Sequence, residues 1–67
     1  MLSIVVNGSS RLCRDTSTIA DLLLDLALDG KRIAVERNGE IVPKSAHAVT
    51  PLAAGDRIEV VRAVGGG

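Results

Sequence analysis

The residues with the clearest potential for chemistry are three consecutive glycines, Gly65–Gly67, that end the printed sequence. Glycine has no Cβ and loses the most conformational freedom on ordering, so we expect residues 65–67 to form a flexible tail. When extended, three residues reach about 10 Å. A thin tail with a carboxylate on Gly67 suits entry into a narrow channel, where a partner enzyme works on the terminal carbonyl. The alternative is a frayed terminus without function, and composition alone does not separate the two interpretations.

Few other residues have side chains that perform chemistry. Cys13 is the single cysteine and His47 the single histidine, so neither has a second ligand at metal-binding spacing, and no metal site is predicted. We expect His47 to lie exposed in a loop. We expect Cys13 to be a small, unreactive strand residue, with a persulfide or a link to a partner enzyme as the alternative. Since no nucleophile–base pair or phosphate-binding loop is recognisable, no catalytic residue is assigned and no enzyme activity is predicted.

Composition excludes several classes of partner. The 67 residues correspond to one domain with a small core. The formal net charge is zero and no residue is aromatic. Duplex binding needs a basic surface and single-strand binding needs aromatic platforms, so no nucleic acid partner is expected. No stretch approaches the roughly 18 apolar residues of a membrane span. The N-terminal residues do not resemble a signal peptide, and a single cysteine cannot form an internal disulfide, so we expect a cytoplasmic protein.

The glycine segment must be positioned by the elements before it, and the clearest of these is a helix within "TSTIADLLLDLALDG" (residues 16–30). Thr18 and Asp21 have the spacing of a capping box, with Asp in place of the preferred Glu or Gln. Gly30 is the expected helix stop. The apolar residues that recur at the spacing of one helical face are Ile19, Leu22, Leu23, Leu26 and Ala27.

Five short strands are expected around this helix. Two are predicted at 2–6 and 11–15, two on either side of Asn38-Gly39, and the last at 57–64. Asn7-Gly8 and Asn38-Gly39 are typical hairpin turns, and segment 44–50 is ambiguous, with one helical turn as an option. The order β-β-α-β-β-β predicts an α+β fold of the ubiquitin-like β-grasp type. In that fold one helix covers one face of a small mixed sheet whose first and last strands pair in the middle, so residues 1–64 form the domain.

Alternation along the last strand predicts a docking surface. Ile58 and Val60 should face the helix, which leaves Val61 and Ala63 on the uncovered face, where Val5 would join them. An exposed apolar stripe of this kind indicates a partner. The alternative is that β-branched residues simply suit strands, exposed or not. The docking residues that we predict are Val5, Val61, Arg62, Ala63 and Val64.

The chain resembles the ThiS family, the sulfur carrier proteins of thiamine biosynthesis, over nearly its whole length. The stretches that carry the resemblance are "IVVNG", "TIADLL", "IAVERNGEIVPKS" and "GDRIEVVRAVGGG". Gly66 and Gly67 match the terminal diglycine of the family, and Gly65 falls at a variable position. A terminal Gly-Gly alone is shared by all ubiquitin-like carriers and modifiers. The chain departs from many relatives in having no aromatic residue.

The resemblance implies a two-step activation of Gly67. A ThiF-type adenylating enzyme would use ATP and Mg²⁺ to convert the carboxylate to an acyl adenylate, and a cysteine persulfide would then leave a thiocarboxylate. A ThiG-type thiazole synthase would take this sulfur into the thiazole ring, and the chain itself would bind no cofactor. The alternatives are a sulfur carrier for molybdopterin or cysteine synthesis, a ubiquitin-like protein modifier, and a ligand-binding β-grasp domain with an incidental tail.

Overall fold

The structure is a computed structural model that describes residues 1–62. It confirms the order of strands and helix expected from the sequence and adds one 3₁₀ helix, η1, in the ambiguous segment. In chain order the elements are β1 (Leu2–Val6), β2 (Ser9–Cys13), α1 (Ile19–Asp25), β3 (Ile33–Arg37), β4 (Glu40–Val42), η1 (Lys44–Val49) and β5 (Arg57–Arg62).

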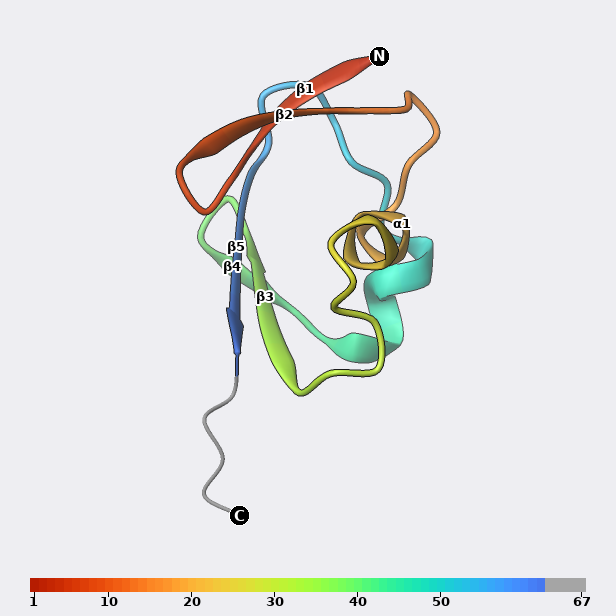
Figure 1. The fold of residues 1–67 in the computed structure, drawn as a ribbon, viewed down its shortest axis with the longest axis vertical. Helices are drawn as coiled ribbons and strands as arrows, with labels where there is room; N and C mark the ends of the chain where they lie inside the picture. The colour runs from red at the N-terminus through yellow and green to blue at the C-terminus, as the bar shows by residue number, and fades with distance from the viewer. Residues whose placement is uncertain (63–67) are drawn as a thin grey trace.

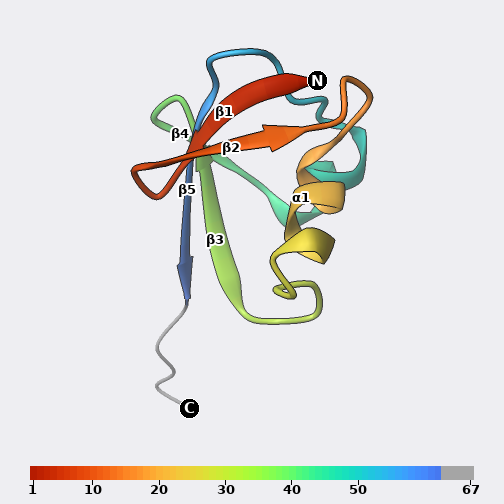
Figure 2. The same cartoon turned by 45° about the horizontal axis from the view of Figure 1, so that its top comes forward.

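The five strands form one mixed sheet in the order β2-β1-β5-β3-β4. β1 and β5 are parallel, and the other neighbours are antiparallel. The first and last strands therefore pair at the centre of the sheet, and α1 and η1 lie on one side of it (Figures 1 and 2). This arrangement confirms the β-grasp prediction, and it makes β5 the strand on which the rest of the sheet is assembled.

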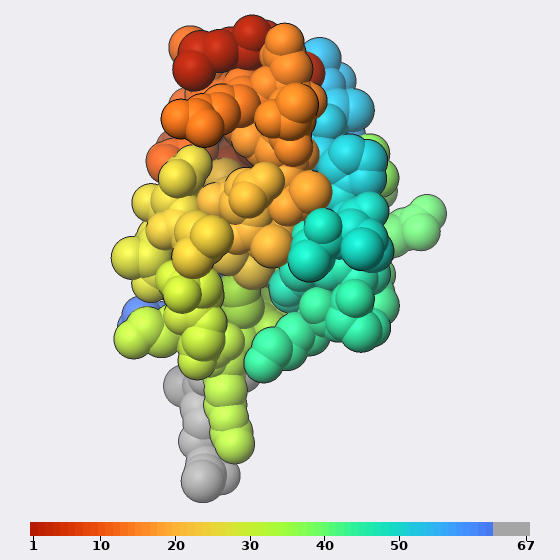
Figure 3. All heavy atoms as spheres, turned by 90° about the vertical axis from the view of Figure 1, so that its right-hand side faces the viewer, coloured from red at the N-terminus to blue at the C-terminus, as the bar shows by residue number. Residues whose placement is uncertain are grey.

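The core is aliphatic and lies between the sheet and α1. Burying each large aliphatic side chain contributes roughly 1.5–3 kcal/mol. On the helix side, α1 and η1 pack against each other and close the surface over this core (Figure 3). The side chains below 2% exposure at its centre are Ile4, Ile19, Val35 and Ile58, with Leu22 at 2%.

The capping box predicted at the start of α1 is present. The backbone N–H of Asp21 donates to Thr18 Oγ1 (3.3 Å), and the backbone N–H of Thr18 donates to Asp21 Oδ2 (2.9 Å). These two bonds satisfy helix N-terminal donors that would otherwise lack partners. Of the helices within residues 1–62, none is long and apolar enough to cross a membrane.

The end of α1 differs from the prediction, because the helix stops at Asp25 instead of continuing to Gly30. The chain leaves the helix at Ala27, whose φ is 58°. The N–H groups of Ala27 and Leu28 donate to the carbonyls of Leu24 (3.0 Å) and Leu23 (2.8 Å). This is a Schellman ending with alanine where glycine is usual. The expectation of a glycine at the helix stop therefore placed the C-terminus of α1 too late, at Gly30.

The second strand also begins earlier than predicted, at Ser9 instead of Arg11. The turn consists of Asn7 and Gly8 alone, with φ values of 48° and 84°. A two-residue turn with both φ values positive joins its strands directly, so Val6 is paired with Ser9.

Candidate functional site

The predicted site lies where β5 leads toward the glycine segment. β5 is described as far as Arg62. The predicted residues Ala63, Val64 and Gly65–Gly67 lie outside the described residues. What the structure does describe is how β5 is held in front of them.

The start of β5 is fixed by Asp56, a buried carboxylate with 5% exposure. Its Oδ2 accepts hydrogen bonds from the backbone N–H of Ala53 (2.8 Å) and from Nε of Arg37 (2.9 Å), and its Oδ1 accepts from Nδ2 of Asn38 (3.0 Å). Burial alone would raise the pKa of Asp56. The three hydrogen bonds and the positive charge of Arg37 outweigh it and lower the pKa below its ordinary value. Sequence reasoning noted the Gly-Asp turn only as part of the resemblance and assigned Asp56 no role.

Asn38 joins the β3–β4 turn to the same end of β5. The side-chain Oδ1 of Asn38 accepts a hydrogen bond from the backbone N–H of Arg57 (2.9 Å), and the backbone N–H of Asn38 donates to the carbonyl of Arg57 (2.8 Å). The "NGE" and "GDR" stretches of the sequence are thus in direct contact. Both short motifs therefore contribute hydrogen bonds at the start of β5.

Asn7 holds β5 from the opposite side. Its Oδ1 accepts from the backbone N–H of Val60 (2.8 Å), and its Nδ2 donates to the carbonyl of the same residue (3.2 Å). A side-chain amide has the same donor and acceptor as a peptide group. Asn7 therefore occupies the ladder position that a further residue of β1 would take.

The predicted docking residues on β5 lie on opposite faces of the sheet. Ile58 is buried and Val60 packs against the core, which confirms that these side chains face the helix. Val61 is 55% exposed on the uncovered face. Because side chains alternate along a strand, Arg62 lies on the helix side, beside Ile33 of β3.

Val5 shares the uncovered face with Val61, but the two side chains do not form one stripe. Val5 is paired with Arg57, four residues before Val61, which is about 13 Å at the rise of a strand. The intervening position of β5 is Glu59, directly opposite Glu36 of β3. The apolar stripe expected from the sequence is thus interrupted by two carboxylates, and of Val5 and Val61 it is Val61 that lies in the C-terminal half of β5.

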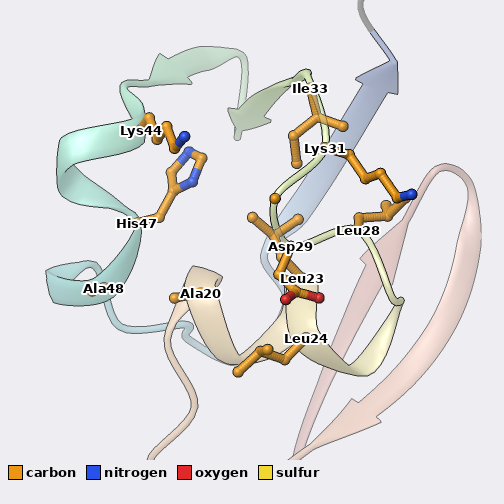
Figure 4. Close-up of a pocket in the computed structure, with 11 residues that line it drawn as sticks. Ala20, Leu23, Leu24, Leu28, Asp29, Lys31, Ile33, Lys44, His47 and Ala48 are labelled. Carbon is orange, nitrogen blue, oxygen red and sulfur yellow. The ribbon is translucent and has the colours of Figure 1, made fainter.

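A groove of about 350 Å³ is the second feature of the described surface, between α1, η1 and the segment that enters β3 (Figure 4). Its lining is mainly aliphatic, with Leu23, Leu24 and Ile33, and the ammonium groups of Lys31 and Lys44 flank it. The groove is on the helix side of the sheet and does not include Val61.

His47 lines this groove, and the prediction that it would be an exposed loop residue is wrong. It is 8% exposed, with Nε2 3.0 Å from the carbonyl oxygen of Val42. Because a carbonyl only accepts, Nε2 carries the proton. The 3₁₀ helix turns the ring back toward the end of β4, which the sequence did not indicate.

Cys13 is buried at the end of β2 as a free thiol. Burial raises the pKa of this thiol, and the charge of Asp25 raises it further, against a lowering effect of Arg11. A raised pKa disfavours the reactive thiolate, in agreement with the expected unreactive role. Among residues 1–62, no group of three or more His, Cys, Asp or Glu side chains is placed to hold a metal ion.

Comparison with known proteins adds a family and three relatives. The model of the ThiS family matches residues 4–67. The sulfur carrier protein ThiS of Bacillus subtilis is 46% identical over 54 residues, 81% of this chain and 82% of that protein. A thiazole synthase of Paramagnetospirillum magneticum is 42% identical over 66 residues, 98% of this chain. The chain spans only 20% of the length of that synthase.

The fold is also that of a solved relative. The crystal structure of the thiamine biosynthesis protein ThiS from Geobacter metallireducens superposes with a TM-score of 0.84 at 28% sequence identity. The match covers 98% of this chain and 100% of that one.

Proposed function

The chain belongs to the ThiS family, whose model matches residues 4–67, and from this premise we propose that it is a sulfur carrier protein of thiamine biosynthesis. The observation that carries the proposal is that the match extends from residue 4 through the domain and includes the Gly66-Gly67 pair. The similarity to the sulfur carrier protein ThiS of Bacillus subtilis supports the same conclusion. In this role the protein is a carrier and co-substrate that a separate enzyme activates.

The chemistry that we propose takes place at the carboxylate of Gly67. A carboxylate is a poor electrophile, so an adenylating enzyme of the ThiF type first joins it to AMP, using ATP and Mg²⁺ and releasing pyrophosphate. The terminal sulfur of a cysteine persulfide then attacks the acyl carbon, and AMP leaves. A second thiol cleaves the resulting acyl disulfide, which leaves a thiocarboxylate on Gly67.

The domain contributes presentation instead of catalysis. We propose that a partner recognises the domain formed by residues 1–64. Gly65 and Gly66 have no side chains that would hinder entry of the segment before Gly67 into a narrow channel. Asp56, Asn38 and Asn7 fix the direction of β5 by hydrogen bonds at both of its edges. We propose that Val61, on the uncovered face, contacts the partner beside the tail, together with Ala63 and Val64, which lie outside the described residues. Arg62 would contribute from the other face, and Val5 belongs to a separate part of the surface.

The partner that we propose for the second step is a thiazole synthase of the ThiG type. A thiazole synthase from Paramagnetospirillum magneticum contains a segment 42% identical to this chain within the same polypeptide. A carrier segment and a synthase joined in one chain support a functional pairing of the two. We place the reaction in the cytoplasm, as expected from the sequence.

The test is intact-mass analysis of the protein after incubation with a ThiF-type enzyme, ATP, Mg²⁺ and a persulfide source. We expect an AMP adduct first and then a mass gain equal to the exchange of one oxygen for sulfur. The matched control is a variant without Gly66 and Gly67, which should gain neither. If the intact chain also gains neither, the carrier function is refuted.

A second incubation separates thiamine biosynthesis from the other sulfur carrier pathways. The thiocarboxylate form is given either to a thiazole synthase or to a molybdopterin synthase large subunit. Sulfur loss only with the thiazole synthase supports the proposal. Attachment of the chain to lysines of other proteins would instead indicate a protein modifier.

A further inference from the structure

β5 directs its backbone groups alternately to its two neighbours. The carbonyls of Asp56 and Ile58 accept hydrogen bonds of 2.9 Å from β1 and the turn that follows it. The backbone groups of Arg57 bond Asn38 instead, on the β3 side. Even-numbered residues of β5 thus present N–H and C=O toward β1, and odd-numbered residues present them toward β3.

The β1 side of β5 loses its partner before the strand ends. β1 pairs with β5 only through Val5 and Val6, and then the chain turns away at Asn7. The side chain of Asn7 takes the next ladder position, opposite Val60. In Figures 1 and 2, the C-terminal half of β5 has β3 beside it while β1 and β2 cross its other end.

Arg62 is the next even-numbered residue, and within residues 1–62 no strand lies on its β1 side. On the other side of β5, the residue of β3 that lies opposite Arg62 is Ile33. The alternation makes this a pair without mutual hydrogen bonds, because Val61 provides the bonds to β3. The N–H and C=O of Arg62 therefore form an open edge in the middle of the sheet order, next to the strand's exit.

We infer that the enzyme that modifies Gly67 supplies an extended strand that pairs with this open edge of β5, starting at the backbone of Arg62. The inference rests on the proposed function, because it names how the partner in that function binds. Open strand edges recruit extended peptides through main-chain hydrogen bonds. Among residues 1–62, no strand pairs with the outer edges of β2 and β4 either. Of these edges, that of β5 belongs to the strand that leads along the chain to the residues that the enzyme must hold.

The geometry offers a selective test, the variant Arg62→Pro. Proline removes the N–H that the partner strand would bond, and it is tolerated on a strand edge whose N–H is unused within the sheet. It also favours extended backbone at the preceding residue, Val61, which is already in a strand. The matched variant Arg62→Ala removes the side chain and keeps the N–H. The comparison of the two isolates the backbone hydrogen bond from the charge.

Affinity for the ThiF-type adenylating enzyme is measured for both variants in the presence of ATP and Mg²⁺. We expect Arg62→Pro to bind about five- to tenfold more weakly than Arg62→Ala, the effect of one lost hydrogen bond. Equal affinities would overturn the strand pairing.

Amide hydrogen exchange on the wild-type chain gives a second measurement that does not depend on the folding of a proline variant. We expect the Arg62 amide to exchange rapidly in the free protein and at least tenfold more slowly in the complex. Protection that appears on β2 or β4 instead would overturn the inference. An AMP adduct without protection of Arg62 refutes the pairing alone. A wild-type chain that neither binds nor gains AMP refutes the proposed function and the pairing with it.

Discussion

The two Asn-Gly turns use the same dipeptide and the same backbone for different purposes. Asn7 and Asn38 have φ values of 48° and 52°, and the glycines after them have 84° and 87°. Both asparagines bond to β5, but from opposite sides: Asn38 bonds Arg57, at the start of the strand, and Asn7 bonds Val60, in its middle. Asn38 does so beside a buried carboxylate, whereas the bonds of Asn7 are exposed. A turn signal in the sequence thus predicts the hairpin, while the role of its side chain depends on residues 19 or 53 positions away.

The largest expected effect comes from removing the carboxylate that makes the Asn38 turn different. Asp56→Ala leaves the side chains of Arg37 and Asn38 and the N–H of Ala53 without their acceptor. We expect the free energy of unfolding to fall by about 2–4 kcal/mol. Urea unfolding followed by circular dichroism measures it. A loss below about 0.5 kcal/mol would mean that Asp56 does not make the contribution of the Asn38 turn to stability different from that of the Asn7 turn.

The charge of Asp56 should also make the difference depend on pH. The pKa of Asp56 is lowered in the folded protein, so the carboxylate stabilises the fold above its unfolded pKa of about 3.9. That contribution is lost as the pH falls through the folded pKa. We expect the stability gap between wild type and Asp56→Asn to shrink as urea unfolding is repeated from pH 7 downward. A difference in the free energy of unfolding that stays constant with pH would contradict the interpretation that the charged form of Asp56 stabilises the fold.

Direct replacement of each turn asparagine by glycine compares the two side chains. Glycine accepts the positive φ without strain, so Asn38→Gly and Asn7→Gly remove the side-chain bonds and add the same freedom to the unfolded chain in both variants. We expect losses of about 1–2 kcal/mol for Asn38→Gly and about 0.5–1 kcal/mol for Asn7→Gly. Hydrogen exchange should speed up at Arg57 in the first variant and at Val60 in the second. A larger loss for Asn7→Gly than for Asn38→Gly would contradict the difference between the two turns.

The smallest expected effect is at Ala27, the remaining described non-glycine residue with positive φ. Unlike the two asparagines, alanine has no side chain that can bond in return for the unfavourable backbone. Ala27→Gly should therefore stabilise the protein, by about 0.5–1 kcal/mol after the added freedom of the unfolded chain is subtracted. A higher midpoint of thermal unfolding would show this, and Ala20→Gly inside α1 should lower the midpoint as the control.

Local patterns in the sequence were sufficient for most of the fold. Turn dipeptides, alternation and the Thr18–Asp21 capping box depend on neighbours a few residues apart, and each is confirmed. The end of α1 was missed because Ala27 adopts a conformation that sequence rules reserve for glycine. His47 was misplaced because its burial depends on how η1 packs against α1 and on the carbonyl of Val42.

The candidate site was less accessible to such reasoning. Alternation correctly placed Val61 on the exposed face, but the separation of Val5 from Val61 depends on the register between β1 and β5. Asp56 stood out only as part of the "GDRIEVVRAVGGG" stretch, since its hydrogen-bond partners Arg37 and Asn38 come from another hairpin. Register and long-range hydrogen bonding are tertiary properties, which explains why a single sequence did not reveal them.

The central place of β5 has a consequence for the order of folding. Contacts between residues as far apart as Asn7 and Val60 close late, because long loops must be ordered first. During synthesis the β1–β2 hairpin and α1 emerge well before β5. The edges of β1 and β3 that pair with β5 therefore stay unpaired until β5 is synthesised, and the five-stranded sheet is completed only then. The strand that leads to the proposed reactive end also completes the domain, so an incompletely made chain has neither a finished recognition surface nor an end to activate.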